Sequence, residues 1–196
     1  MKDLPKLQAQ FYERALQDIV GKDVFQRLLK SPLDELTRYG VLLRRFNLPL
    51  LQAVFKEWLP DESEEKAEAR NRFNQLIRYP HVESTGNFIY AFHKLLREIL
   101  AQYIRVQEPK KWRHYHQLAL DFLRQEVESP LYPDWYYHLL ACDEVQGVSY
   151  WKDIQSREPS EYLNALKEVA RDSTLKLTLA TIQCMDLQRD TTSNPA

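Results

Sequence analysis

Apolar residues recur every three or four positions along most of this chain, the spacing that places them on one face of an α-helix. The first such run extends from Leu4 to Ile19, and Gly21 supplies the left-handed position that commonly ends a helix. A shorter apolar run occupies residues 24–29. These two segments predict a helical lead over residues 1–30.

Three further helices are predicted in the next part of the chain. Ser31 can cap the first of them, and its apolar residues continue as far as Leu43. Asn47 can cap the second, which Pro60 ends. After an acidic, solvated stretch, the third should span about 64–78.

A β-hairpin then interrupts the helical pattern. Residues 81–83 and 88–92 have the composition of two short strands, and the link over 84–87 contains a glycine that permits the positive φ of a hairpin turn. A strongly periodic helical run follows over 92–104. The order helix, helix, helix, hairpin, helix is that of a winged helix.

The predicted fold class is therefore mainly α, with a winged-helix domain over residues 31–106 and α-helical segments on either side. Glu108 and Pro109 break the helix that follows the hairpin. Residues 109–188 form a predicted α-helical region, either a helical pair or the start of a superhelix. The polar residues 189–196 are predicted to be a disordered tail.

Composition narrows the class of protein further. The chain has 196 residues, of which 44% are hydrophobic, so it can bury a core. A formal net charge of -1 supplies no overall field that would attract nucleic acid or an anionic membrane. The chain has only two cysteines and opens with no signal peptide, which predicts a cytoplasmic protein. No apolar run approaches the roughly 20 residues that a membrane-spanning helix needs, which predicts a soluble one.

The stretch from Phe88 to Leu100 resembles the signal-transduction ATPases with numerous domains, the STAND family that includes the NB-ARC and NACHT proteins. In that family a winged helix follows the nucleotide-binding core. A histidine of a Met-His-Asp type motif at the end of the wing contacts the β-phosphate of bound ADP. The matching triplet here is residues 92–94, with His93 as the phosphate contact and Lys94 where the family has Asp. Residues 38–51 are also similar to the first two winged-helix helices of such regulators.

The resemblance implies a non-catalytic regulatory or interaction module that relays nucleotide state. The sequence contains no G-x-x-x-x-G-K-[ST] loop, the motif that binds the phosphates of ATP. Contact with ADP or ATP is therefore expected only through a missing nucleotide-binding domain of the same or another chain. The chain itself is not expected to be an enzyme or to hold a cofactor of its own. Imidazole at a helix start can donate to phosphate, because free N–H groups and the helix dipole there already favour anions. The simpler alternative is that His93 caps the helix or packs under the wing.

A winged-helix transcription regulator is a second interpretation, since such domains often place the third helix in the major groove. Three acidic residues, Glu64, Glu65 and Glu68, nearly cancel the cations of that helix, and the wing tip is uncharged, which argues against DNA as a partner. The candidate DNA contacts on the third helix are Lys66, Arg70, Arg72 and Arg78.

A third interpretation is a free-standing adaptor that binds protein partners through aromatic residues of the C-terminal region. Trp135, Tyr136 and Trp151 suit either a helical core or a partner surface, because aromatic residues dominate both settings. His138 and Cys142 stand four residues apart, but a structural zinc site needs four ligands, so no metal site is predicted.

Overall fold

The computed structural model describes residues 7, 10–11, 14–15, 32–60 and 66–154. Most of the helical lead, residues 155–188 of the C-terminal helical region and the tail over 189–196 lie outside the described residues. Within the described part the fold is mainly α-helical, as the sequence predicts. No helix there combines the length and the apolar character needed to cross a membrane.

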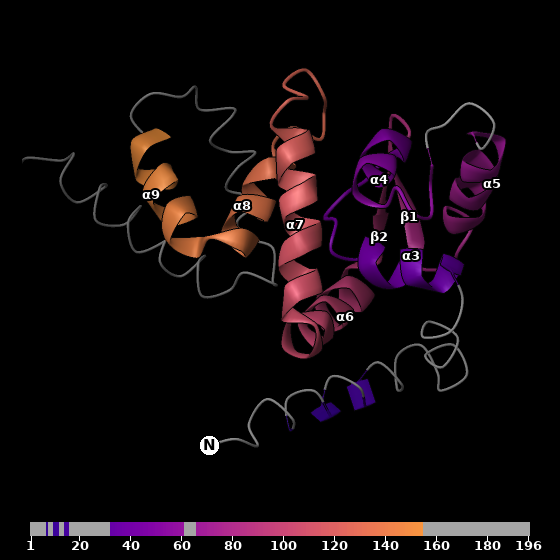
Figure 1. Cartoon of the computed structure of the whole chain (residues 1–196), viewed down its shortest axis with the longest axis horizontal. Coiled ribbons are helices and arrows are strands. Elements are labelled where there is room, and N and C mark those ends of the chain that lie inside the picture. Colours follow the sequence, from indigo (N-terminus) through magenta and orange to yellow (C-terminus); the bar gives the residue numbers. More distant parts are fainter. Residues whose placement is uncertain (1–6, 8–9, 12–13, 16–31, 61–65, 155–196) are drawn as a thin grey trace, which may run out of the picture.

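Helices and one hairpin follow each other in the predicted order. A long helix, α7, stands between two groups of elements, with α3 to α5 and the hairpin on one side, α8 and α9 on the other, and α6 at its foot (Figure 1). In chain order, the described elements are α3 (Pro32–Gly40), α4 (Leu48–Val54), α5 (Lys66–Leu76), β1 (Val82–Gly86), β2 (Ile89–Phe92), α6 (Lys94–Gln107), α7 (Pro109–Leu123), α8 (Asp134–Cys142) and α9 (Glu144–Ile154).

The first described helix, α3, is shorter than its apolar pattern predicts. It ends at Gly40 instead of continuing to Leu43, because residues 41–43 are all fully buried and three consecutive side chains of a helix cannot point to one side. A Cβ atom at Gly40 would lie 3.0 Å from the ring of Phe92, so a glycine allows this close approach to β2.

The predicted cap of α4 is present. The Oδ1 atom of Asn47 accepts a hydrogen bond from the backbone N–H of Leu50 at 3.0 Å, which satisfies one of the free donors of the first turn. The helix ends earlier than predicted, at Val54, and turns over residues 56–58 lead on toward Pro60. These turns bring the side chain of Trp58 back toward α7.

The hairpin is confirmed, with a tighter turn than predicted. Strands β1 and β2 pair antiparallel with Val82 opposite Phe92, and β1 continues to Gly86, which has φ of 95°. The turn consists of Asn87 and Phe88, both with positive φ, at 51° and 58°. Two left-handed residues are the geometry of a type I′ turn, whose twist matches that of the paired strands.

The hairpin is held to the helices by the segment between α3 and α4. The N–H of Phe46 donates to the carbonyl of Tyr90 at 2.8 Å, and the N–H of Tyr90 donates back to the carbonyl of Phe46 at the same distance. The two rings also stack, with centroids 6.1 Å apart. This exchange adds a third extended segment beside β2 and fixes the hairpin to the core.

Helices α7 and α8 form the predicted antiparallel pair. The indole N–H of Trp112, near the start of α7, donates to the carbonyl of Ala141, near the end of α8, at 3.4 Å. The next helix, α9, is absent from the sequence prediction, although Asp143 caps it by accepting from the N–H of Gln146 at 2.9 Å. An Asp with Gln three residues later is a start signal that the sequence analysis overlooked.

A partly buried ion-pair network joins the two sides of α7. Asp134, the first residue of α8, has a fully buried carboxylate that accepts from Arg44 at 2.7 Å and from two nitrogens of Arg45 at 3.0 Å. Arg45 also donates to the carbonyl of Pro130 at 3.1 Å. These contacts link residues about ninety positions apart in the sequence, so α8 is fixed against the α3–α4 connection and not only against α7.

Candidate functional site

His93 lies at the junction between the hairpin and α6. Its N–H donates to the carbonyl of His81 at 2.7 Å, which continues the pairing of the hairpin, and its carbonyl accepts from the N–H of Arg97 at 3.0 Å, which starts the helix. The imidazole is exposed and makes no capping hydrogen bond. His93 therefore occupies the N-cap position of α6, as the simpler alternative expects, but its side chain neither caps the helix nor packs under the wing.

The surroundings of His93 suit an anion more than a cation. The start of α6 presents backbone N–H groups with the positive end of the helix dipole, and α6 contains no acidic residue in its first turn. Lys94, which stands where the resembled family has Asp, is exposed and lies 3.7 Å from a carboxylate oxygen of Glu98. Backbone N–H groups at a helix start are a common binding site for anions.

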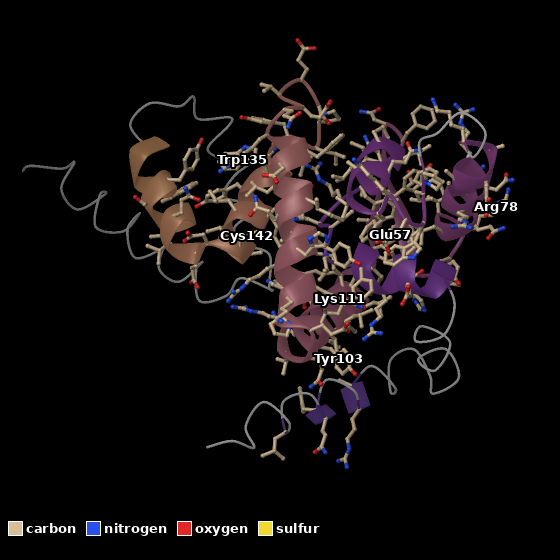
Figure 2. All side chains as sticks on the ribbon, in the orientation of Figure 1. Glu57, Arg78, Tyr103, Lys111, Trp135 and Cys142 are labelled. Atoms are coloured by element: carbon tan, nitrogen blue, oxygen red, sulfur yellow. The ribbon has the colours of Figure 1, made fainter. Side chains whose placement is uncertain are left out.

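Of the four candidate DNA contacts, Lys66, Arg70 and Arg72 lie on α5, and Arg78 follows the end of that helix. Arg72 is engaged within the fold: it donates to the carbonyl of Trp58 at 2.8 Å and pairs with Glu68 one turn away. Lys66, Arg70 and Arg78 are exposed, and Arg78 lies on the side of α5 away from α7 (Figure 2). With Arg72 engaged and the carboxylate of Glu68 exposed on the same helix, fewer phosphates could be neutralised by α5 than its count of cations suggests.

The aromatic residues proposed as a partner surface lie in the core. Trp135 is 4% exposed, and Tyr136 and Trp151 are fully buried. The rings of Tyr136 and Trp151 stack at 6.1 Å, and the hydroxyl of Tyr136 donates to the carbonyl of Gly147 at 3.1 Å. The interpretation of this cluster as a binding surface is corrected by its burial, and the core interpretation holds.

A buried histidine pair joins α7 to α8, and the sequence analysis did not predict it. The Nδ1 atoms of His116 and His138 are 2.8 Å apart, and both side chains are fully buried. Burial lowers the pKa of His138 to about 3, and it lowers the pKa of His116 well below 6.5, with further contributions from His138 and the positive charge of Arg105. Both rings are therefore neutral, and one Nδ1–H donates to the other Nδ1.

The outer nitrogens of this pair have no partner, since neither Nε2 atom finds a hydrogen-bonding group among the described residues. His116 stands 22 residues before His138 on a different helix, so no local pattern could have indicated the contact. The pair is not a metal centre as it stands: the described residues contain no group of three or more His, Cys, Asp or Glu placed to hold an ion. The nearby Cys142 is a poor nucleophile, because burial raises the pKa of its thiol to about 11.

A second polar cluster fastens α3 to the corner between α6 and α7. Glu108, which separates those two helices, pairs with Arg38 and accepts from the hydroxyl of Tyr39 at 2.8 Å. The Nζ atom of Lys111 donates to the same hydroxyl at 2.6 Å, and Lys111 lies on the α3 side of α7 (Figure 2). Burial raises the pKa of Tyr39, so its hydroxyl stays protonated and can donate to Glu108 while it accepts from Lys111.

Comparison with known proteins adds no further evidence. No protein-family model, no curated protein and no solved structure matches this chain.

Proposed function

We propose that this chain is the regulatory winged-helix and helical part of a STAND-type signalling ATPase in the cytoplasm, acting by contact with a nucleotide-binding domain of the same or another chain. The observation that carries the proposal is the position of His93. The hairpin delivers it to the start of a 14-residue helix, with its imidazole exposed and without a hydrogen-bonding partner among the described residues. The resemblance around residues 88–100 implies that same position for the histidine that contacts the β-phosphate of ADP.

The anchoring of the hairpin supports the winged-helix assignment. In the described residues, α3, α4 and α5 come before the hairpin and α6 follows it directly, and Phe46, between α3 and α4, adds an extended segment to the edge of β2. Such an anchored hairpin is what a winged helix requires of its wing. Its last residue, Phe92, packs into the core beside Phe46 with ring centroids 5.3 Å apart, so the backbone of His93 is held in place.

The relay function rests on how firmly the parts of the chain are joined. Glu108 binds α3 to the start of α7, and Asp134 binds the α3–α4 connection to the start of α8. A displacement of the wing by bound nucleotide would therefore move α7 and α8 with it, since these partly buried ion pairs would have to break for the parts to separate. In this proposal the chain transmits nucleotide state to its C-terminal helices as one body.

The test is ADP release from the assembled ATPase, with the nucleotide-binding domain encoded beside or within the same reading frame. His93→Ala should speed release of a fluorescent ADP analogue by about tenfold, because one charge-assisted contact to phosphate is lost. His81→Ala removes a neighbouring imidazole of the hairpin and should leave release unchanged. Equal release from wild type and His93→Ala would refute the phosphate contact, and ATP turnover by the isolated chain would refute the non-catalytic role.

A further inference from the structure

We propose that the cavity between the turn after α4 and the middle of α7 binds a small molecule with a single aromatic ring and both a carboxylate and an ammonium group. The cavity has a volume of about 200 Å³. Residues from Ala53 to Trp58 form one wall, and His114, Tyr115 and Leu118 of α7 form the other. This ligand site is separate from the contact proposed for His93, which does not line the cavity.

The wall of the cavity is aromatic and continuous. The rings of Phe55 and Tyr115 lie 5.1 Å apart at an interplanar angle of 49°, and those of Phe55 and Trp58 lie 5.6 Å apart at 30°. Trp58 and Tyr115 close the set at 6.3 Å. Phe55 is 2% exposed, so the half-buried rings of Trp58 and Tyr115 supply most of the aromatic surface of the cavity, which favours an incoming ring in an offset or edge-to-face position.

Two hydrogen-bonding groups in this wall have no partner among the described residues. Neither the hydroxyl of Tyr115 nor the indole N–H of Trp58 is hydrogen-bonded there, although both side chains are half-buried. Tyr and Trp side chains usually find a partner for their polar atoms when they become buried, so a ligand that covers these two would be expected to supply one. Burial raises the pKa of Tyr115 to about 12, so its hydroxyl is protonated and can donate to a ligand oxygen.

Charges at the mouth of the cavity select the ligand further. Lys56 and Glu57 are consecutive, exposed and of opposite sign, and both line the cavity. Glu57 lies on the α3–α5 side of α7 (Figure 2). A ligand with one charge would meet a repelling group as well as an attracting one, whereas a zwitterion can place its carboxylate at Lys56 and its ammonium at Glu57.

The volume limits the ligand to one ring. An apolar cavity of about 150 Å³ accommodates benzene, so this cavity holds a ring with a few more atoms, and it is smaller than the sites of drug-sized ligands, which begin at about 300 Å³. An aromatic α-amino acid has the required ring, charges and size. A ligand this small should bind with a dissociation constant of about 0.1–1 mM.

L-Phenylalanine titrated into the full-length, isotope-labelled chain, observed by amide NMR, tests the proposal. We expect saturating shifts confined to residues 53–58 and 114–118, and about tenfold weaker binding of L-leucine, which lacks the ring. Benzoate and phenethylamine, which each carry one of the two charges, should also bind several-fold more weakly. Absence of shifts at about 10 mM L-phenylalanine, or equal binding of L-leucine, overturns the proposal.

Variants locate the site. Leu118→Trp fills the cavity and should abolish the shifts, whereas Phe122→Trp, one turn further along α7 and outside the cavity, should leave them unchanged. Tyr115→Phe removes only the hydroxyl and should weaken binding several-fold, and Lys56→Ala should do the same through the carboxylate. Binding of L-phenylalanine that survives Leu118→Trp overturns the proposed site. If circular dichroism shows that Leu118→Trp is unfolded, the other two variants decide: unchanged affinity in both Tyr115→Phe and Lys56→Ala overturns the site.

Discussion

Acidification from about pH 7.5 to about pH 5 should destabilise this chain through the histidine pair between α7 and α8. His116 and His138 are fully buried and have lowered pKa values, so neither takes up a proton in the folded state over this range. In the unfolded chain both imidazoles titrate near 6.5. The unfolded state therefore binds more protons below that pH, and stability that is complete above it is lost as the pH falls.

The size of the effect follows from the number of protons. For each proton that only the unfolded state binds, the free energy of unfolding falls by about 1.36 kcal/mol per pH unit below 6.5. Two imidazoles and a fall of about 1.5 units, to about pH 5, therefore lower it by about 4 kcal/mol. His138, with a folded pKa of about 3, still contributes fully at that pH. Small domains are stable by about 5–15 kcal/mol in all, so the loss is a large fraction of the total.

Urea unfolding followed by circular dichroism at several pH values measures this loss. With a slope of about 2 kcal/mol/M, the midpoint should fall by about 2 M between pH 7.5 and pH 5. The double variant His116→Leu, His138→Leu replaces both polar partners by apolar groups and should remove most of the pH dependence at little cost near neutral pH. His114→Leu, an exposed neighbour on α7, is the matched control and should keep the wild-type dependence.

Single variants distinguish the pair from two independent histidines. His138→Leu alone leaves His116 buried with an unsatisfied Nδ1, so it should cost about 1–3 kcal/mol more than the double variant at neutral pH. The reasoning fails if wild type loses less than about 1 kcal/mol on acidification, or if the double variant keeps the same pH dependence as wild type.

Three further substitutions test other contacts by unfolding measurements. Asp134→Asn should destabilise the chain by about 3 kcal/mol, because it leaves two arginines facing an uncharged group, and a loss below about 1 kcal/mol would contradict the role of this network. Gly147→Ala should lower the free energy of unfolding by about 1–3 kcal/mol, since the added Cβ would lie 2.4 Å from a methyl carbon of Leu140. Gly86→Ala should also destabilise the chain, but through backbone strain, because Gly86 has φ of 95° and open space around its Cβ position. Phe88→Gly should raise stability by about 0.5–1 kcal/mol, because the side chain is 85% exposed and its φ is 58°, and a measured loss would show that Phe88 makes a contact of its own.

Much of the fold could be predicted from the sequence because its signals are local. The cap at Asn47, the break at Glu108 and Pro109, and the hairpin around Gly86 each depend on a few neighbouring residues. The errors are also local in origin. The apolar spacing predicts that α3 continues to Leu43, because spacing does not reveal where a chain must turn. It does not predict α9, because the cap at Asp143 precedes only a weak apolar pattern.

The candidate sites also divide into features that the sequence determines and features that only the tertiary structure shows. The sequence by itself determined that a histidine follows the hairpin at a helix start, since order along the chain fixes that position. It could not determine that Trp135 and Trp151 are buried, because an aromatic side chain looks the same in a core and on a surface. Only the tertiary structure decided the meeting of His116 with His138, of Asp134 with Arg45, and the aromatic cavity beside α7. Those contacts join residues far apart in the chain, and their geometry depends on how whole helices pack, which no local pattern contains.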